Sequence, residues 1–153
     1  MDNKSFRHVK FNFSEITDNI YLGTNLCCTI PAHTQVLKNK GINADINLEN
    51  ERQEEFPDVK VYLWLPVVDK TAPSQFQLGV GARAIDSVVK SHKKVYVHCK
   101  NGHSRSPALV AAYFILKGMN PEDAIAKIKS KRPEIHLLDV QLEALRKYYN
   151  EKT

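Results

Sequence analysis

The stretch "KVYVHCKNGHSRSPALVAAYFILK", residues 94–117, contains the features that decide the fold. Residues 94–98 are rich in β-branched and aromatic side chains, which predicts a short buried strand. Residues 106–117 are apolar almost all round, which predicts a helix running through the core, too short to span a membrane. A polar loop containing a glycine joins the two, so the stretch predicts a strand, a loop and a buried helix.

The flanking sequence continues this alternation of strands and helices. We expect an early strand or hairpin at 15–23, strands at 42–48 and 59–66, the second ended by Pro66, and helices at 31–41, 74–92, 121–132 and 139–151. In the helix at 74–92, Ser74 is the expected N-cap, and the apolar positions are Phe76, Val80, Ile85, Val88 and Val89. In the last helix, Leu142, Leu145 and Tyr149 are expected on one face. The pattern predicts an α/β fold: a central, mainly parallel twisted sheet flanked by helices.

Length and composition limit the classes of protein. The chain has 153 residues, 42% of them hydrophobic, and no linker or repeat interrupts it, so we expect a single domain over residues 1–153. No apolar stretch is long enough for a membrane span, and the N-terminus lacks the apolar segment of a secretory signal. We therefore expect an intracellular, cytoplasmic protein without a transmembrane segment.

Cysteine and charge content exclude two further classes of structure. Three cysteines, of which Cys27 and Cys28 are adjacent, form neither a disulfide framework nor a zinc-site spacing. We expect Cys27 and Cys28 to be helix-edge or core residues rather than redox partners of Cys99. The formal net charge of +5 favours anionic partners, although basic runs such as Lys127, Lys129, Lys131 and Arg132 are expected simply to face solvent.

The loop from Lys100 to Arg105 has the residues of a phosphate-binding loop. It follows the carboxyl end of a predicted strand and precedes a helix N-terminus, where α/β proteins bind anions. Successive backbone N–H groups can form a concave anion site, and Gly102 permits the positive φ that such a curl requires. Arg105 adds a planar, permanently charged fork for two phosphate oxygens. We therefore expect the phosphate to be bound by Lys100, Asn101, Gly102, His103, Ser104 and Arg105.

Cys99, at the base of this loop, is the candidate nucleophile. The loop N–H groups, the helix dipole and Arg105 all favour its thiolate form. A thiolate beneath a bound phosphoryl group can attack phosphorus in line, form a cysteinyl-phosphate and be regenerated by water, with no metal or cofactor. A buried structural thiol is the alternative interpretation of Cys99.

The leaving oxygen needs a proton, so this mechanism requires a general acid on another loop. Asp69 is the best candidate, because it lies in "LPVVDKTAP" just after a predicted strand end. The same carboxyl can take a proton back when it activates water. Asp58, Asp86 and an ordinary turn carboxylate remain the alternatives at this point.

With these residues assembled, the chain resembles the dual-specificity-type cysteine-dependent phosphatases of the protein tyrosine phosphatase superfamily. "HCKNGHSRS" matches their signature HCxxGxxRS at His98, Cys99, Gly102, Arg105 and Ser106. The segments "IYLGTNLC", "LKNKGINADINL", "LPVVDKTAP" and "AIAKIKSKRPEIHLLDVQLEAL" are also similar to successive blocks of the family. The resemblance implies that Ser106 donates a hydrogen bond to the departing thiolate and that His98 helps to set the pKa of Cys99.

The likeness leaves the substrate open. The family usually carries an asparagine soon after the "RP" block, where this chain has Asp139 and Gln141 in "LLDVQ". This ending is similar to the phosphatidylglycerophosphate phosphatase branch, and Lys100 would suit a multiply charged head group. His103 is expected at the rim of the site.

We expect removal of phosphate from protein phosphotyrosine, and also from phosphoserine and phosphothreonine. The alternatives are a lipid head group (phosphatidylglycerophosphate or a phosphoinositide), RNA 5′ phosphates, or a non-catalytic phosphate-binding module. The expected partners are thus a phosphorylated protein or a phospholipid head group. We expect no stable nucleic-acid complex, and a monomer.

Overall fold

The computed structural model describes residues 9–26, 31–53 and 58–151. Its strands are β1 (Phe13–Glu15), β2 (Ile20–Gly23), β3 (Ala44–Glu49), β4 (Val61–Val67) and β5 (Val95–His98). Its helices are α1 (Pro31–Asn39), α2 (Gln75–Lys90), α3 (Arg105–Leu116), α4 (Pro121–Lys131) and α5 (Asp139–Glu151). The expected hairpin, strands and helices are therefore all present, with ends shifted by a few residues.

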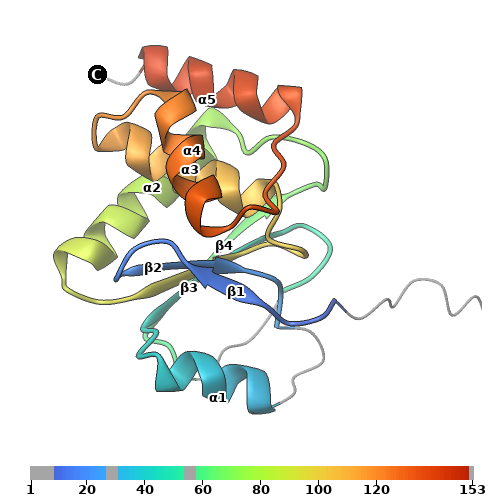
Figure 1. Ribbon diagram of the computed structural model, residues 1–153, viewed down its shortest axis with the longest axis vertical. Helices are drawn as coiled ribbons and strands as arrows, with labels where there is room; N and C mark the ends of the chain where they lie inside the picture. Colours follow the sequence, from blue (N-terminus) through green and yellow to red (C-terminus); the bar gives the residue numbers. More distant parts are fainter. Residues whose placement is uncertain (1–8, 27–30, 54–57, 152–153) are drawn as a thin grey trace, which may run out of the picture.

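The strands form one mixed sheet in the order β1-β2-β5-β3-β4. β1 pairs with β2 antiparallel, while β2, β5, β3 and β4 pair parallel to their neighbours. In Figure 1, α1 covers one face of the sheet, and α2 to α5 cover the other. This arrangement confirms the α/β fold with a mainly parallel sheet, and it places β5 between β2 and β3.

We expected Pro66 to end the strand predicted at 59–66, but the structure differs. β4 continues through Pro66 to Val67. The reason is the position of β4 at the edge of the sheet. A proline that lacks a backbone N–H is tolerated on an edge strand, because one side of that strand has no partner to receive the hydrogen bond.

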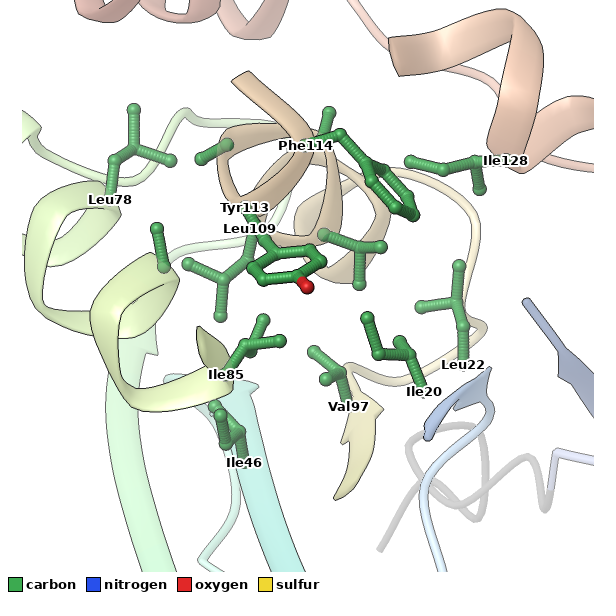
Figure 2. Close-up of a cluster of buried hydrophobic side chains, with 14 of the residues drawn as sticks. Ile20, Leu22, Ile46, Leu78, Ile85, Val97, Leu109, Tyr113, Phe114 and Ile128 are labelled. Atoms are coloured by element: carbon green, nitrogen blue, oxygen red, sulfur yellow. The ribbon is translucent and has the colours of Figure 1, made fainter. Parts of the chain in front are cut away.

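Helix α3 is the centre of the larger core, as predicted from its apolar sequence. Every residue from Arg105 to Ile115 is buried. Figure 2 shows Leu109, Tyr113 and Phe114 of α3 among side chains from the sheet and from α2 and α4. Because α3 follows β5 through the loop at 99–104, this packing fixes both ends of that loop.

The buried face of α2 includes only part of the apolar positions identified in the sequence. Ser74 is the N-cap, in a capping box with Gln77, as its position predicted. However, the helix buries Leu78, Gly79, Gly81, Ala82 and Ile85, while Phe76 is 79% exposed. Glycine is required on this face, because a Cβ on Gly81 would lie 2.3 Å from Cδ1 of Leu109. Of the expected apolar positions, Ile85 is buried and Val88 and Val89 pack against the core, whereas Phe76 lies outside it.

Helix α5 also packs through a face next to the expected one. Its buried residues are Gln141, Leu145 and Tyr148, whereas Leu142 is partly exposed and Tyr149 is 39% exposed. Leu145 is common to the predicted and observed faces. The contact face of α5 therefore includes a polar residue, Gln141, which hydrophobicity alone does not predict.

Candidate active site

Cys99 lies directly after the central strand β5, at the carboxyl end of the parallel strands. It is 2% exposed. Its Sγ lies 3.2 Å from Oγ of Ser106, in the first turn of α3, and either atom can be the donor. Cys99 and Ser106 are thus brought together by the short loop between β5 and α3, defined here as the phosphate-binding loop (residues 99–105).

Arg132 binds the outer side of this loop. It follows α4 and is fully buried, so the expectation that it faces solvent is wrong. Its Nε donates to the carbonyl of Gly102 (2.9 Å), and its Nη2 donates to the carbonyl of Asn101 (3.1 Å). Nη1 donates to Oγ of Ser14 (3.2 Å) and lies 3.3 Å from the carboxylate of Glu134. Burial lowers the pKa of Arg132, the largest effect on it, while Glu134 acts in the opposite direction.

Two backbone donors complete the outer contacts of the loop. The carbonyl of Lys100 accepts from the N–H of Asn25, just after β2, at 3.1 Å. The carbonyl of His103 accepts from the N–H of His136 at 2.7 Å. Four successive carbonyls, from residues 100 to 103, are therefore bonded to segments outside the loop.

The outward carbonyls determine where the loop N–H groups point. In a trans peptide the C=O and N–H bonds have opposite directions, so the N–H groups turn to the concave side. Within the described part of the chain, no N–H from Lys100 to Ser104 donates to a protein acceptor. Such an arc of unpaired N–H groups is of the kind that can bind an anion.

Gly102 makes this curvature possible. Its φ is +68°, and a Cβ would lie 2.5 Å from the carbonyl oxygen of Gly23 and 2.9 Å from Nη2 of Arg132. Both the backbone conformation and the close approach of β2 therefore exclude a side chain here.

Arg105 is 1% exposed, and a carboxylate and a carbonyl orient its guanidinium group. Nη1 donates to both oxygens of Glu51 (2.7 and 3.1 Å) and to the carbonyl of Val67 (2.9 Å). Nη2 lies 3.6 Å from Oδ1 of Asp69. The buried Nε has no acceptor among the described residues. The group thus has one edge fixed by protein, while Nε remains available for an anion.

Asp69 reaches this site from the loop between β4 and α2, defined here as the acid loop (residues 68–74). Its side chain is 55% exposed, and Oδ1 accepts a hydrogen bond from the N–H of Lys70 (3.0 Å). The two alternative carboxylates form ion pairs with lysines: Asp58 with Lys38, and Asp86 with Lys90 and Lys117. Of the three aspartates, Asp69 is the one that lies beside Arg105.

His98, the last residue of β5, lies next to a buried carboxylate. Its Nε2 is 2.9 Å from Oδ1 of Asp45 on β3, and both side chains are fully buried. The adjacent carboxylate restrains the orientation of the imidazole ring. The sequence pattern did not indicate this pair, because the partners come from different strands.

The remaining predicted residues lie around the rim of the phosphate-binding loop. Asn101 and His103 are exposed, while Lys100 and Ser104 are partly exposed. Partial burial lowers the pKa of His103, and the charge of Arg132 lowers it further. His103 is therefore mainly neutral near pH 7.

Sequence reasoning missed the residues that support the site from a distance. Glu51, Asp45 and Arg132 contact Arg105, His98 and the loop carbonyls, respectively. Acidic residues soon after a strand were the available signal for Glu51. Cys27 and Cys28, whose role was predicted, lie outside the described residues. Within 9–26, 31–53 and 58–151 no group of acidic, histidine or cysteine side chains could hold a metal ion.

Known proteins share this arrangement. A family model, "Dual specificity phosphatase, catalytic domain", matches residues 20–151. The mouse "Phosphatidylglycerophosphatase and protein-tyrosine phosphatase 1" is 47% identical over 60 residues, which cover 39% of this chain and 31% of the relative. The Arabidopsis thaliana "Dual specificity protein phosphatase 1" is 31% identical over 122 residues, covering 78% and 60%, respectively. The matches thus span less than two thirds of these relatives.

Solved structures give the same result for the fold. A crystal structure of PTPMT1 in complex with PI(5)P has a TM-score of 0.80 and 26% identity, covering 91% of this chain and 95% of that one. A point variant of human DUSP28 has a TM-score of 0.80 and 25% identity, covering 90% and 94%. In the described residues no helix is long and apolar enough to cross a membrane. The matched residues and the shared fold show that this chain belongs to the dual-specificity phosphatase catalytic domain family.

Proposed function

We propose that this chain hydrolyses phosphomonoesters through a cysteinyl-phosphate on Cys99, acting on phosphotyrosine and on phosphoserine and phosphothreonine in proteins. The observation that carries the proposal is the outward bonding of the four carbonyls from residues 100 to 103. It leaves an arc of N–H groups beside a buried cysteine and Arg105. These donors match the equatorial oxygens of a phosphoryl group in its transition state.

In the first step, the Cys99 thiolate attacks phosphorus, and the bond from phosphorus to the ester oxygen breaks. Asp69 gives its proton to that oxygen, so that an alcohol or phenol leaves instead of an alkoxide. The loop N–H groups and Arg105 bind the oxygens on which negative charge spreads. The exposure of Asp69 at the rim, 3.6 Å from Arg105, supports its role as this acid.

In the second step, water attacks the phosphorus of the cysteinyl-phosphate. The Asp69 carboxylate takes a proton from that water, and the bond from phosphorus to sulfur breaks to release inorganic phosphate. The thiolate that leaves is stabilised by the hydroxyl of Ser106, which lies 3.2 Å from Sγ. His98, which lies beside Asp45 and directly precedes Cys99, is the residue to which the family resemblance assigns a role in favouring this thiolate.

A phospholipid head group is the second candidate substrate. It is favoured by the likeness to a solved structure of PTPMT1 bound to PI(5)P and by relatives named as phosphatidylglycerophosphatases. Lys100, partly exposed at the loop, supplies a charge for a second phosphate. Protein and lipid substrates present the same phosphate to the loop, so residues at the rim distinguish them.

We further propose that the protein acts as a single catalytic domain over residues 1–153, as a cytoplasmic monomer that forms no stable complex with nucleic acid. Helices α2 to α5 share one core cluster with the sheet, and α1 packs in a second cluster with the same sheet, which supports the first of these statements. The others follow from sequence composition, and they are open to direct tests by localisation and by light scattering.

The deciding experiment compares wild type with Cys99→Ser and Asp69→Asn, with chelator present and at several pH values. The substrates are p-nitrophenyl phosphate, a phosphotyrosine peptide and phosphatidylglycerophosphate. We expect turnover in wild type and a loss of at least about 10³-fold in Cys99→Ser, because the nucleophile is removed. The relative kcat/KM for peptide and lipid decides the substrate class. Wild type that binds vanadate but turns over none of the three would instead be a phosphate-binding module.

A further inference from the structure

Gln141 is a buried polar residue that the mechanism described above does not use. It lies in the first turn of α5 and is fully buried. Its Nε2 donates to the carbonyl of Thr71 in the acid loop (3.1 Å), and its Oε1 accepts from the N–H of Leu138 (2.8 Å). One side chain therefore joins the acid loop to the segment that precedes α5.

The orientation of this amide is determined by its two partners. The N–H of Leu138 can only donate, and the carbonyl of Thr71 can only accept. A flipped amide would place like groups against each other at both ends, so the observed orientation is the one that satisfies both bonds. A glutamine is thus suited to this position in a way that a carboxylate or an apolar side chain is not.

The contact at Thr71 fixes the turn that carries Asp69. The N–H and hydroxyl of Thr71 both donate to the carbonyl of Val68, at 3.1 and 2.6 Å, which closes a turn around Asp69 and Lys70. Lys70 has a φ of +66°, a conformation that a non-glycine residue adopts at a cost. An external contact at Thr71 therefore supports a turn that contains a residue in an unfavourable conformation.

The other contacts of the acid loop lie at its ends. Arg105 binds the carbonyl of Val67 at the start, and Gln77 binds the carbonyl of Pro66 and the N–H of Ser74. Neither of these hydrogen bonds reaches the middle of the loop, where Arg105 makes an ion-pair contact with the Asp69 side chain at 3.6 Å but no hydrogen bond to the backbone. Among the described residues, Gln141 provides the one hydrogen bond from another part of the fold to the segment 68–73.

We propose that Gln141 is a positioning residue: by binding the carbonyl of Thr71, it holds the turn that presents the Asp69 carboxyl to the leaving oxygen. The inference rests on the proposed function, because it requires Asp69 to be the general acid. It adds a residue from α5, 70 positions away in the sequence from Thr71, to the machinery of proton transfer.

The test is the dependence of kcat/KM on the leaving group in wild type, Asp69→Asn, Gln141→Met and Gln141→Asn. The substrates are 2,4-dinitrophenyl, p-nitrophenyl and phenyl phosphate. A poor leaving group needs the proton, whereas an activated one departs without it. We expect Gln141→Met to lose about tenfold more activity on phenyl than on dinitrophenyl phosphate, because a small displacement of a catalytic group is costly. Asp69→Asn should show the same trend more strongly.

Two controls separate positioning from a general structural effect. Leu145→Val lies one turn further along the buried face of α5, and its apolar side chain cannot donate to the carbonyl of Thr71. It should lower thermal stability without changing the leaving-group dependence. Vanadate affinity should stay within about twofold of wild type in Gln141→Met, since the phosphate-binding loop is unaltered. Gln141→Asn keeps an amide that is too short to join both partners, and it replaces Gln141→Met if that variant does not fold.

The outcomes distinguish this inference from the function on which it rests. An equal loss on all substrates in both Gln141 variants, or a loss of vanadate affinity, overturns the positioning role while the phosphatase stands. A leaving-group effect in Leu145→Val of the same size also overturns it. A flat response in Asp69→Asn removes Asp69 as the acid, and the positioning role with it. Activity in Cys99→Ser would instead refute the proposed function.

Discussion

The phosphate-binding loop and the acid loop are held in opposite ways. In the first, the carbonyls of residues 100 to 103 are all bonded by distant segments, and Arg132 is buried behind them. In the second, Asp69 is more than half exposed, and among the described residues a single hydrogen bond from another part of the fold, donated by Gln141, reaches the middle of the loop. Each loop follows the carboxyl end of a parallel strand: the phosphate-binding loop follows β5, and the acid loop follows β4.

The difference fits the role that we propose for each loop. Donors that stabilise a charged transition state are effective when they are fixed before the reaction, because no energy is then spent on reorienting them. A general acid must exchange its proton with water between turnovers and must let the product leave. A buried, fully bonded loop suits the first role, and an exposed loop with few contacts suits the second.

The largest effect is expected from breaking the support of the phosphate-binding loop with Arg132→Met. This change removes the charged hydrogen bonds to the carbonyls of Asn101 and Gly102. We expect a loss of about 2–3 kcal/mol in the free energy of unfolding, measured with urea, because those carbonyls lose their donors. kcat/KM should fall about 100-fold as the N–H groups lose their alignment.

Lys131→Met is the matched control for this variant. Lys131 is the exposed neighbour of Arg132 and carries the same charge. It should leave the unfolding free energy within about 0.5 kcal/mol of wild type. Equal effects of the two substitutions would mean that net charge, and not contact with the loop, is responsible.

A smaller effect is expected from Gly102→Ala, which changes the loop backbone itself. The left-handed φ of +68° and the 2.5 Å approach to the Gly23 carbonyl both oppose a Cβ. We expect a loss of about 1–3 kcal/mol in unfolding free energy. kcat/KM should fall about tenfold, since the loop must shift.

Gly118→Ala sharpens the interpretation of Gly102→Ala. Gly118 also has a positive φ, +111°, but a Cβ there would meet nothing within 4 Å. The control should lose stability through strain alone and keep full activity. If Gly102→Ala behaves in the same way, the close packing of the loop against β2 does not matter for catalysis.

The smallest effect is expected from His103→Gln at the rim. Burial, helped by Arg132, lowers the pKa of His103 below its ordinary value of 6.5. The unfolded chain therefore binds this proton more readily than the folded chain, and stability falls as the pH falls through the unfolded pKa. We expect the decrease in melting temperature between about pH 7.5 and about pH 5.5 to be slightly smaller in His103→Gln. An unchanged or larger decrease would contradict this sign.

The sequence predicted those parts of the fold that depend on neighbours along the chain. The strand at 94–98, the apolar helix after it and the Ser74 N-cap are local patterns, and the structure contains all three. Predictions that depended on the helical face were less successful. Phe76 and Tyr149 are exposed while Ile85 and Leu145 are buried, and Gly81 and Gln141 occupy buried positions that hydrophobicity does not reveal.

In the candidate site, too, residues that are close in sequence were easier to predict than residues that are distant in sequence. Cys99, Gly102, Arg105 and Ser106 lie within eight consecutive residues, so their spacing and chemistry indicated a phosphate-binding loop without any knowledge of the fold. Asp69 needed one further inference, that loops after parallel strands meet at one edge of the sheet. The choice of Asp69 over Asp58 and Asp86 as the acid remains a prediction, supported by its distance from Arg105.

The sequence by itself thus determined the α/β class and the loop in which a cysteine, a glycine and an arginine are joined, because these depend on short-range periodicity and spacing. Only the tertiary structure decided which distant residues support that loop: Arg132 for its carbonyls, Glu51 for Arg105, Asp45 for His98 and Gln141 for the acid loop. The physical reason is that a buried polar group must find a partner through space, and many positions along the chain could supply one. Packing selects among them.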